Sequence, residues 1–236
     1  MNIQTFYQKA PMTLLCILSF VCVALSQLLL GVNFDQPSFD ELIRFGANFL
    51  PLTLADEPWR LLSGVFLHIG LIHLLLNSFA MYYFGQVVEG IVGRSLFLAV
   101  FLLSAIGGNL LSLFVTWQSV MNGGLANVSA GASGGIMGLG SFLLVVAIFK
   151  IPTAFVLDAK NLFIVMAINL VMGFALPGID NAGHVGGVMV GLLFGGVFVL
   201  SSKTTLPKMS VWVLAVLLLV AFVLIWWQLH MQLWHD

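Results

Sequence analysis

The strongest constraint on this chain is a series of long apolar windows that contain no charged side chain. The longest uncharged run extends over 55 residues, from Ser95 to Phe149. A helix needs about 20 apolar residues, within a range of about 17–25, to cross the hydrocarbon core of a bilayer. We expect seven such spans, at about 11–31, 62–86, 95–117, 132–149, 161–177, 182–200 and 209–229. Charged residues form 7% of the chain, against about a quarter of a soluble domain. The sequence therefore predicts an all-α polytopic membrane protein in contact with the lipid bilayer.

The distribution of basic residues predicts the orientation of these spans. Six of the eight lysines and arginines fall at the N-terminus or in the loops after spans two, four and six: Lys9, Arg94, Lys150, Lys160, Lys203 and Lys208. Short loops rich in Lys and Arg stay in the cytoplasm. We therefore expect a cytoplasmic N-terminus and, with an odd number of spans, a C-terminus outside. A bacterial inner membrane is the expected location.

The charge balance also excludes a class of partner. The net charge is −1, from eight basic and nine acidic residues. No basic patch is large enough to follow a phosphate backbone, so we expect no nucleic acid partner. The loop between spans one and two, residues 32–61, mixes apolar with acidic residues. It is predicted to form short amphipathic pieces at the outer leaflet.

Two polar residues at matching depth suggest chemistry inside the membrane. Ser133, framed by glycines, stands at the outer end of span four, and His184 stands at the outer end of span six. A serine hydroxyl becomes nucleophilic when an imidazole accepts its proton, so a shared depth is the first requirement of a Ser–His pair. The alternative interpretations are a serine bonded to its own helix and glycines that serve packing alone.

Small residues near both positions favour close approach of the two helices. Gly134 and Gly138 flank the Ser133 face, while Gly187 and Gly191 share a stripe with His184. Pairs of small residues four apart let helix axes come close together. Close axes are needed to bring Ser Oγ within about 3 Å of an imidazole nitrogen.

Span two adds a second polar group, His73 and Asn77, which lie four residues apart on one helix face. Both can donate hydrogen bonds, and with the Ser133 N–H they would stabilise the oxyanion formed when a serine attacks an amide. Two alternatives stay open. One is an interhelical polar clasp. The other is a zinc site from His68, His73 and His184, although no His-Glu-x-x-His pattern is present.

Taken together, these motifs resemble those of the rhomboid intramembrane serine proteases. The resemblance rests on Gly-Ala-Ser-Gly at 131–134, His-xxx-Asn at 73–77 and Gly-His-xx-Gly-xxx-Gly at 183–191, with Trp59-Arg60, Gly85 and Glu89 in support. It covers about 59–196 and implies a six-helix rhomboid core, here within one membrane domain, 1–236. The core occupies about 11–200, and residues 201–236 add a linker and a seventh C-terminal transmembrane helix.

The resemblance also implies roles for these residues. Ser133 is the expected nucleophile, His184 the general base and then acid, and His73, Asn77 and the Ser133 amide the oxyanion hole. No metal or cofactor is implied. Some family members stack a tyrosine on the histidine, but that position here is Met137. Asp180, four residues before His184, either orients the imidazole or faces water.

The resemblance implies that the substrates are transmembrane proteins with one span, cleaved near the outer membrane face. Hydrolysis needs water, so we expect a polar cavity open to the outer side, reached by a non-helical segment, 123–132. A substrate helix is expected to enter beside span five, where Met172-Gly173-Phe174 form part of a gate.

Two other functions stay open. A rhomboid-like pseudoprotease would bind membrane helices without cutting them, although such proteins typically lack one member of the dyad. A transporter or channel would carry ionisable groups along its pathway. No acidic residue is expected well inside a span.

Overall fold

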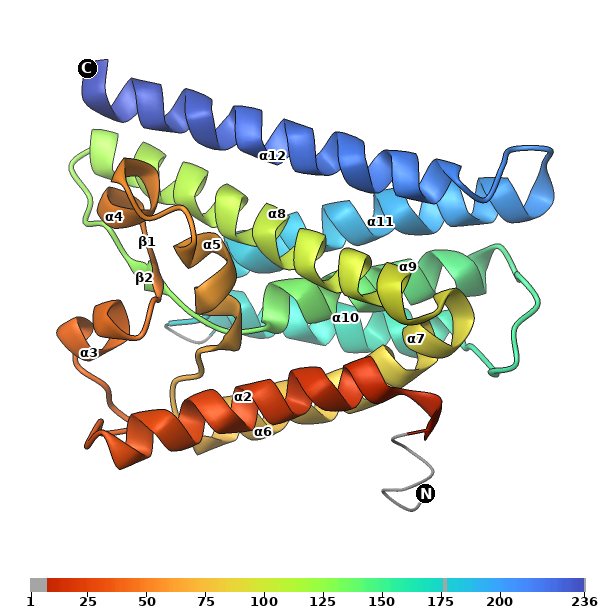
Figure 1. The fold of residues 1–236 in the computed structure, drawn as a ribbon, viewed down its shortest axis with the longest axis horizontal. Coiled ribbons are helices and arrows are strands. Elements are labelled where there is room, and N and C mark those ends of the chain that lie inside the picture. Colours follow the sequence, from red (N-terminus) through yellow and green to blue (C-terminus); the bar gives the residue numbers. More distant parts are fainter. Residues whose placement is uncertain (1–7, 176–177, 236) are drawn as a thin grey trace.

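The computed structural model describes residues 8–175 and 178–235 as a bundle of long helices (Figure 1). In this part of the chain, five helical stretches are long and apolar enough to cross a membrane. They are Pro11–Leu29 (α2), Leu71–Val92, Arg94–Met121 (α8), Asn181–Lys203 (α11) and Ser210–Leu233 within Ser210–His235 (α12). Two shorter apolar helices, Ser133–Ile148 (α9) and Ala159–Ala175 (α10), complete the set. The predicted all-α integral membrane protein is confirmed, and the six-plus-one count of crossings stays a prediction.

The main difference from the predicted spans concerns span two, which was expected over 62–86. Residues Arg60–Ser63 (α5) and Gly64–Phe66 (η1) instead form short helical turns. The long helix begins at Leu71, after Gly70, whose φ of 82° breaks the preceding backbone. It runs through Leu71–Ala80 (α6), a π-helical segment Met81–Gly85 (η2) and Gln86–Val92 (α7). The span is therefore shifted toward the C-terminus and includes Glu89.

Glu89 lies in the last turn of this helix, so the expectation that no acidic residue lies well inside a span is not contradicted. Its side chain is 3% exposed and accepts hydrogen bonds from Met12 N at 3.0 Å, Thr13 N at 2.8 Å and Thr13 Oγ1 at 2.8 Å. The first N–H groups of a helix have no partner within the helix and favour a negative charge. Glu89 thus caps the start of α2 and serves the fold.

The short elements gather at one end of the bundle, where the C-terminus also lies, and the N-terminal part lies toward the other end (Figure 1). They are Phe39–Arg44 (α3), Asn48–Phe49 (β1), Leu50–Ala55 (α4), α5 and Val128–Ser129 (β2). The two strands pair antiparallel, with Asn48 opposite Ser129 and Phe49 opposite Val128. The loop 32–61 therefore contains short helices and is tied to the segment that precedes Ser133. Its expected place at the outer leaflet stays a prediction.

Arg60 holds this loop together from inside. Its side chain is 4% exposed, pairs with the Glu57 carboxylate, and donates from Nη1 to Ile43 O at 2.8 Å and Ala47 O at 3.1 Å. The guanidinium carbon also lies 4.6 Å from the centre of the Trp59 ring. A buried charge needs such partners, so the loop is a fixed part of the fold.

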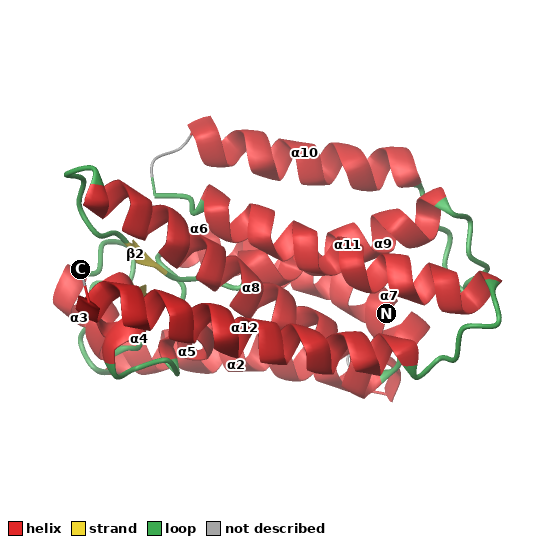
Figure 2. Ribbon diagram, turned by 90° about the horizontal axis from the view of Figure 1, so that it is seen from above, coloured by secondary structure: helices red, strands yellow, loops and turns green. Residues whose placement is uncertain are grey.

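Helix α11 packs closely on α9 and α8 in the core of the bundle. Fully buried aromatic side chains fill the core around these helices: Phe97, Phe101, Phe142 and Phe194. Helix α10 lies along one edge (Figure 2) and leaves most of its large apolar side chains exposed, including Phe163, Val171 and Phe174. In a membrane protein such a surface faces lipid.

Candidate active site

Ser133 is the first residue of α9 and follows a segment that is not helical. Gly131, with φ of +132°, and Ala132 lead into it, and Gly131 N donates to Gly64 O at 2.8 Å. No side chain caps this helix start in the described residues. The N–H groups of the first turn therefore lack a partner within the helix. Ser133 itself is half-buried, and its hydroxyl makes no hydrogen bond to any described residue.

His184 lies in the first turn of α11. Its backbone N–H donates to Asp180 O at 3.1 Å, and its side chain is 6% exposed. Nδ1 is buried and has no hydrogen-bond partner within 8–175 and 178–235. The structure does not join the two expected catalytic side chains, since no hydrogen bond between Ser133 and His184 occurs among the described residues. Catalytic hydrogen bonds are often long in unliganded enzymes and shorten when substrate binds.

Glycines bring the helices of these two residues together. A Cβ added at Gly187 would lie 1.9 Å from Gly134 O, and one at Gly191 would lie 2.1 Å from Gly138 O. A Cβ at Gly134 would lie 3.1 Å from Gly183 O. The residues directly after Ser133 and directly before His184 are therefore in backbone contact. At Gly187 and Gly191 no larger side chain fits between α9 and α11 unless the two helices move apart.

A buried hydroxyl strengthens the same helix pair. Ser141, which is fully buried, donates to Val188 O on α11 at 3.0 Å and lies 3.0 Å from Gly138 O on its own helix. On the other side of α11, a Cβ at Gly186 would lie 2.7 Å from Gly107 O and 2.8 Å from Gly108 Cα on α8. Helix α11 is thus fixed between two close backbone contacts.

His73 faces the segment that leads to Ser133. A Cβ added at Gly131 would lie 2.8 Å from His73 Nε2 and 4.0 Å from Ser133 Oγ, so both side chains approach one point of the backbone. The backbone N–H of Ile69 donates to His73 Nδ1 at 3.4 Å. Because Nδ1 accepts, the neutral ring carries its proton on Nε2. His73 therefore presents an N–H donor on the side of Ser133.

Asn77 has a different environment. It is 6% exposed, and its Nδ2 donates to His73 O on its own helix at 3.2 Å. Its expected place in an oxyanion hole stays a prediction. The His68 ring meets the His73 ring edge to face, with ring centres 5.1 Å apart and planes at 65°, and His68 Nδ1 lies 3.3 Å from Phe66 O. In the described part of the chain, no group of three or more His, Cys, Asp or Glu side chains is placed to hold a metal, so the alternative zinc site is not formed.

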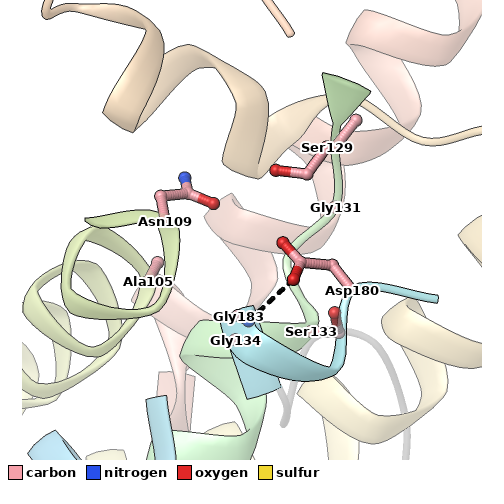
Figure 3. Close-up of a pocket in the computed structure, with 9 residues that line it drawn as sticks. Ala105, Asn109, Ser129, Gly131, Ser133, Gly134, Asp180 and Gly183 are labelled. Atoms are coloured by element: carbon pink, nitrogen blue, oxygen red, sulfur yellow. Dashed lines mark hydrogen bonds between the residues drawn. The ribbon is translucent and has the colours of Figure 1, made fainter. Parts of the chain in front are cut away.

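A small pocket of about 20 Å³ lies beside Ser133 (Figure 3). It has room for about one water molecule. Ser133 and Gly134 line it together with Asn109, Ser129 and Asp180, among others. A larger polar cavity of about 410 Å³ shares Ser129 and Asp180 with it. It is lined in part by β2, one of the short elements at one end of the bundle (Figure 1).

The structure gives Asp180 a defined structural role. Its carboxylate is half-buried, accepts a hydrogen bond from Gly183 N at 2.8 Å (Figure 3) and caps the start of α11. Asp180 thus fixes the first turn, which carries His184, and also lines the serine pocket. Met137, at the position where some relatives have tyrosine, is 3% exposed and packed in the core.

Sequence reasoning missed two polar residues of the pocket, Asn109 and Ser129. Asn109 Nδ2 donates to Leu61 O at 2.8 Å, so it links α8 to α5. A lone asparagine in an apolar helix was an available signal, because polar groups in a span are rarely free of function. Ser129 had no such signal, since it lies in a polar segment outside the spans.

Comparison with known proteins identifies the family of this chain. The family model of the rhomboid domain matches residues 55–201. Rhomboid protease GluP of Bacillus subtilis is 36% identical over 180 residues, which cover 76% of this chain and 32% of GluP. Rhomboid protease AarA of Providencia stuartii is 29% identical over 226 residues, 88% of this chain and 80% of AarA. RHOMBOID-like protein 4 of Arabidopsis thaliana is 35% identical over 158 residues, 66% of this chain and 38% of that protein.

The extent of these matches differs between relatives. The chain spans about a third of the length of GluP and most of the length of AarA. The matched domain covers more than half of the chain and contains Ser133, His184, His73 and Asn77. By the match to the rhomboid domain over most of its helical bundle, this chain belongs to the rhomboid family.

Proposed function

We propose that this protein is an intramembrane serine endopeptidase, in which Ser133 and His184 form a catalytic dyad. The observation that carries the proposal is the backbone contact of Gly134 with Gly183 and Gly187, directly beside both residues. Membership of a family that includes proteins named rhomboid protease supports the same activity.

The first half of the proposed reaction forms an acyl-enzyme on Ser133. Ser133 Oγ attacks the carbonyl carbon of the scissile amide, while neutral His184 accepts the hydroxyl proton. The carbonyl oxygen becomes an oxyanion that receives hydrogen bonds from the free N–H groups at the start of α9 and from His73 Nε2. Asn77 has a second N–H with which to join them. His184 then gives its proton to the leaving amine as the C–N bond breaks, which leaves an acyl ester on Ser133.

The second half consumes one water molecule. Water loses a proton to His184 and attacks the ester carbon, the ester C–O bond breaks, and His184 returns the proton to Ser133 Oγ. The pocket beside Ser133 has the size of about one water molecule and a polar lining that includes Asn109 and Ser129. The larger polar cavity next to it supplies a route for water from one end of the bundle.

The substrates are transmembrane helices of other membrane proteins. Helix α10 is the proposed lateral gate, because it lies at the edge of the bundle with Met172 and Phe174 exposed. The end of the bundle with the short elements faces outward, since six of the eight basic residues belong to the other end, which faces the cytoplasm. Cleavage then occurs near the outer face of a bacterial inner membrane.

Cleavage in proteoliposomes tests the proposal. The purified protein is reconstituted with fluorescent single-span proteins that carry a small residue near the outer end of the helix. Wild type is expected to cut some of them, with full activity in EDTA, and Ser133→Ala and His184→Ala to cut none. Ser202→Ala, at an exposed serine on α11, is the matched control and should cut like wild type. Equal cutting by Ser133→Ala would refute the dyad. Retention of test helices without cutting by folded wild type would favour the non-proteolytic alternative.

A further inference from the structure

Helix α12 lies outside the matched rhomboid domain but contacts the loop near the active site. Trp226 Nε1 donates to Thr53 O at 2.8 Å, and His230 Nδ1 lies 2.6 Å from Leu54 O. The two rings stack with centres 5.3 Å apart and planes at 19°. The last carbonyl groups of a helix have no partner within the helix. Side chains of α12 therefore satisfy the C-terminal carbonyls of the short helix α4.

The same short helix is linked inward through buried polar side chains. Thr53 Oγ1 donates to Asn48 Oδ1 at 3.0 Å and accepts from Phe49 N at 3.1 Å. Asn48 Nδ2 lies 3.4 Å from Ser129 Oγ and 3.3 Å from Asn109 O. Thr53 is fully buried and Asn48 is 2% exposed. Water cannot easily replace these partners, so each bond constrains the next residue.

The inner end of this network is the approach to Ser133. Asn48 and Ser129 are paired in the β1–β2 ladder, and two residues later Gly131 N is bonded to Gly64 O at 2.8 Å. Asn109, Ser129 and Gly131 all line the pocket that contains Ser133. A continuous series of bonds and strand pairing thus runs from α12 to the residues that set the backbone before the nucleophile.

We propose that Trp226 and His230 are positioning residues, and that α12 holds the 128–131 segment in the place that the reaction at Ser133 requires. The inference rests on the proposed function for its catalytic consequence. Its structural half, the coupling of α12 to the 128–131 segment, stands independently of catalysis.

Trp226→Phe is the first test, because phenylalanine keeps an aromatic ring and removes the N–H donor. Trp227→Phe is the matched control, since Trp227 is the next residue of α12, is 55% exposed, and among the described residues makes no hydrogen bond to the loop. Substrate cleavage by Trp226→Phe should fall about 3- to 10-fold, the effect of one buried hydrogen bond, mainly in kcat. Hydrogen exchange of the backbone amides at 128–131 should become faster. Trp227→Phe should change neither.

A second pair of variants breaks the network without touching α12. Thr53→Val removes the hydroxyl at nearly constant volume and should reproduce both effects, while Thr53→Ser keeps the hydroxyl and should restore activity. The double variant, which combines Trp226→Phe and Thr53→Val, should show a smaller fold-loss of cleavage rate than the product of the two single fold-losses, because both substitutions act on one network. Unchanged exchange in Trp226→Phe and Thr53→Val would overturn the coupling. Faster exchange with wild-type cleavage would overturn the positioning role. If Ser133→Ala retained wild-type cleavage, the proposed function would fail, and exchange alone would still decide the coupling.

Discussion

A methyl group at Gly187 would meet the backbone of α9 directly. The added Cβ would lie 1.9 Å from Gly134 O, 2.7 Å from Gly134 C and 3.1 Å from Gly134 Cα. To restore a contact of 3.4 Å with the oxygen, α11 has to move away by about 1.5 Å. A flexible side chain could rotate aside, but a helical carbonyl group cannot. The helix that carries His184 therefore has to shift relative to the helix that carries Ser133.

The size of the effect differs between stability and activity. Overpacking of a close contact costs about 1–3 kcal/mol, which lowers the unfolding temperature by several degrees while the fold persists. A displacement of about 1 Å between reacting groups can lower a rate about 100-fold. We therefore predict that Gly187→Ala stays folded and loses about two orders of magnitude in the rate of substrate cleavage.

Gly196→Ala provides the control on the same helix. A Cβ at Gly196 meets no described atom within 4 Å, so the substitution tests alanine in α11 without a clash. Alanine favours a helix over glycine by about 1 kcal/mol, and this variant should be at least as stable as wild type and fully active. Cleavage at the wild-type rate by Gly187→Ala would refute the reasoning. An equal loss of cleavage rate in Gly196→Ala would also refute the reasoning, because a clash could not then explain the loss.

Three further predictions concern other parts of the molecule. Glu89→Ala should lower the free energy of unfolding by about 3 kcal/mol, because it leaves the N–H groups at the buried start of α2 without their acceptor. The control Asp40→Asn, at an exposed acid, should stay within about 0.5 kcal/mol of wild type. Equal unfolding temperatures for the two variants would contradict this prediction. Hydrogen bonds from Ser38, backbone first and hydroxyl second, lower the pKa of Glu41 from its ordinary 4.5. These hydrogen bonds stabilise α3 above the ordinary pKa of Glu41, and this stabilisation is lost as the pH falls through the lowered pKa. Hydrogen exchange of the backbone amides in 39–44 should therefore accelerate only in acid. His73→Ala should reduce kcat by about 10- to 1000-fold with a small change in KM, and a change in KM alone would argue against an oxyanion donor.

The helices were predictable because lipid imposes a simple length and charge rule, and each of the seven apolar windows contains a long helix in the described residues. The same rule failed at 62–70, where apolar residues form turns around Gly64 and Gly70. Hydropathy does not distinguish a turn packed on protein from a helix in lipid. Hydropathy also did not predict that Glu89 would be buried in the last turn of its helix, because its partners, Met12 and Thr13, belong to another helix.

In the candidate site, the spacing of small residues in the sequence predicted the contact between the backbones of α9 and α11. The small residues near Ser133 and His184 predicted a close helix pair, and a stripe of glycines has few other uses. The neighbours of Ser133 that come from distant segments, Asn109 and Ser129, could not be found in this way. Their positions depend on the pairing of β1 with β2 and on loop contacts, which no local pattern encodes.

Labelling with a fluorophosphonate probe tests the central claim most directly, because it requires an activated serine and no knowledge of the substrate. Folded wild-type protein, Ser133→Ala, His184→Ala and the control Ser202→Ala are treated in detergent, and the labelled residue is identified by mass spectrometry. The account predicts one label, on Ser133, in wild type and in Ser202→Ala, and none in the other two variants. Labelling that persists in Ser133→Ala, or that is independent of His184, would contradict it.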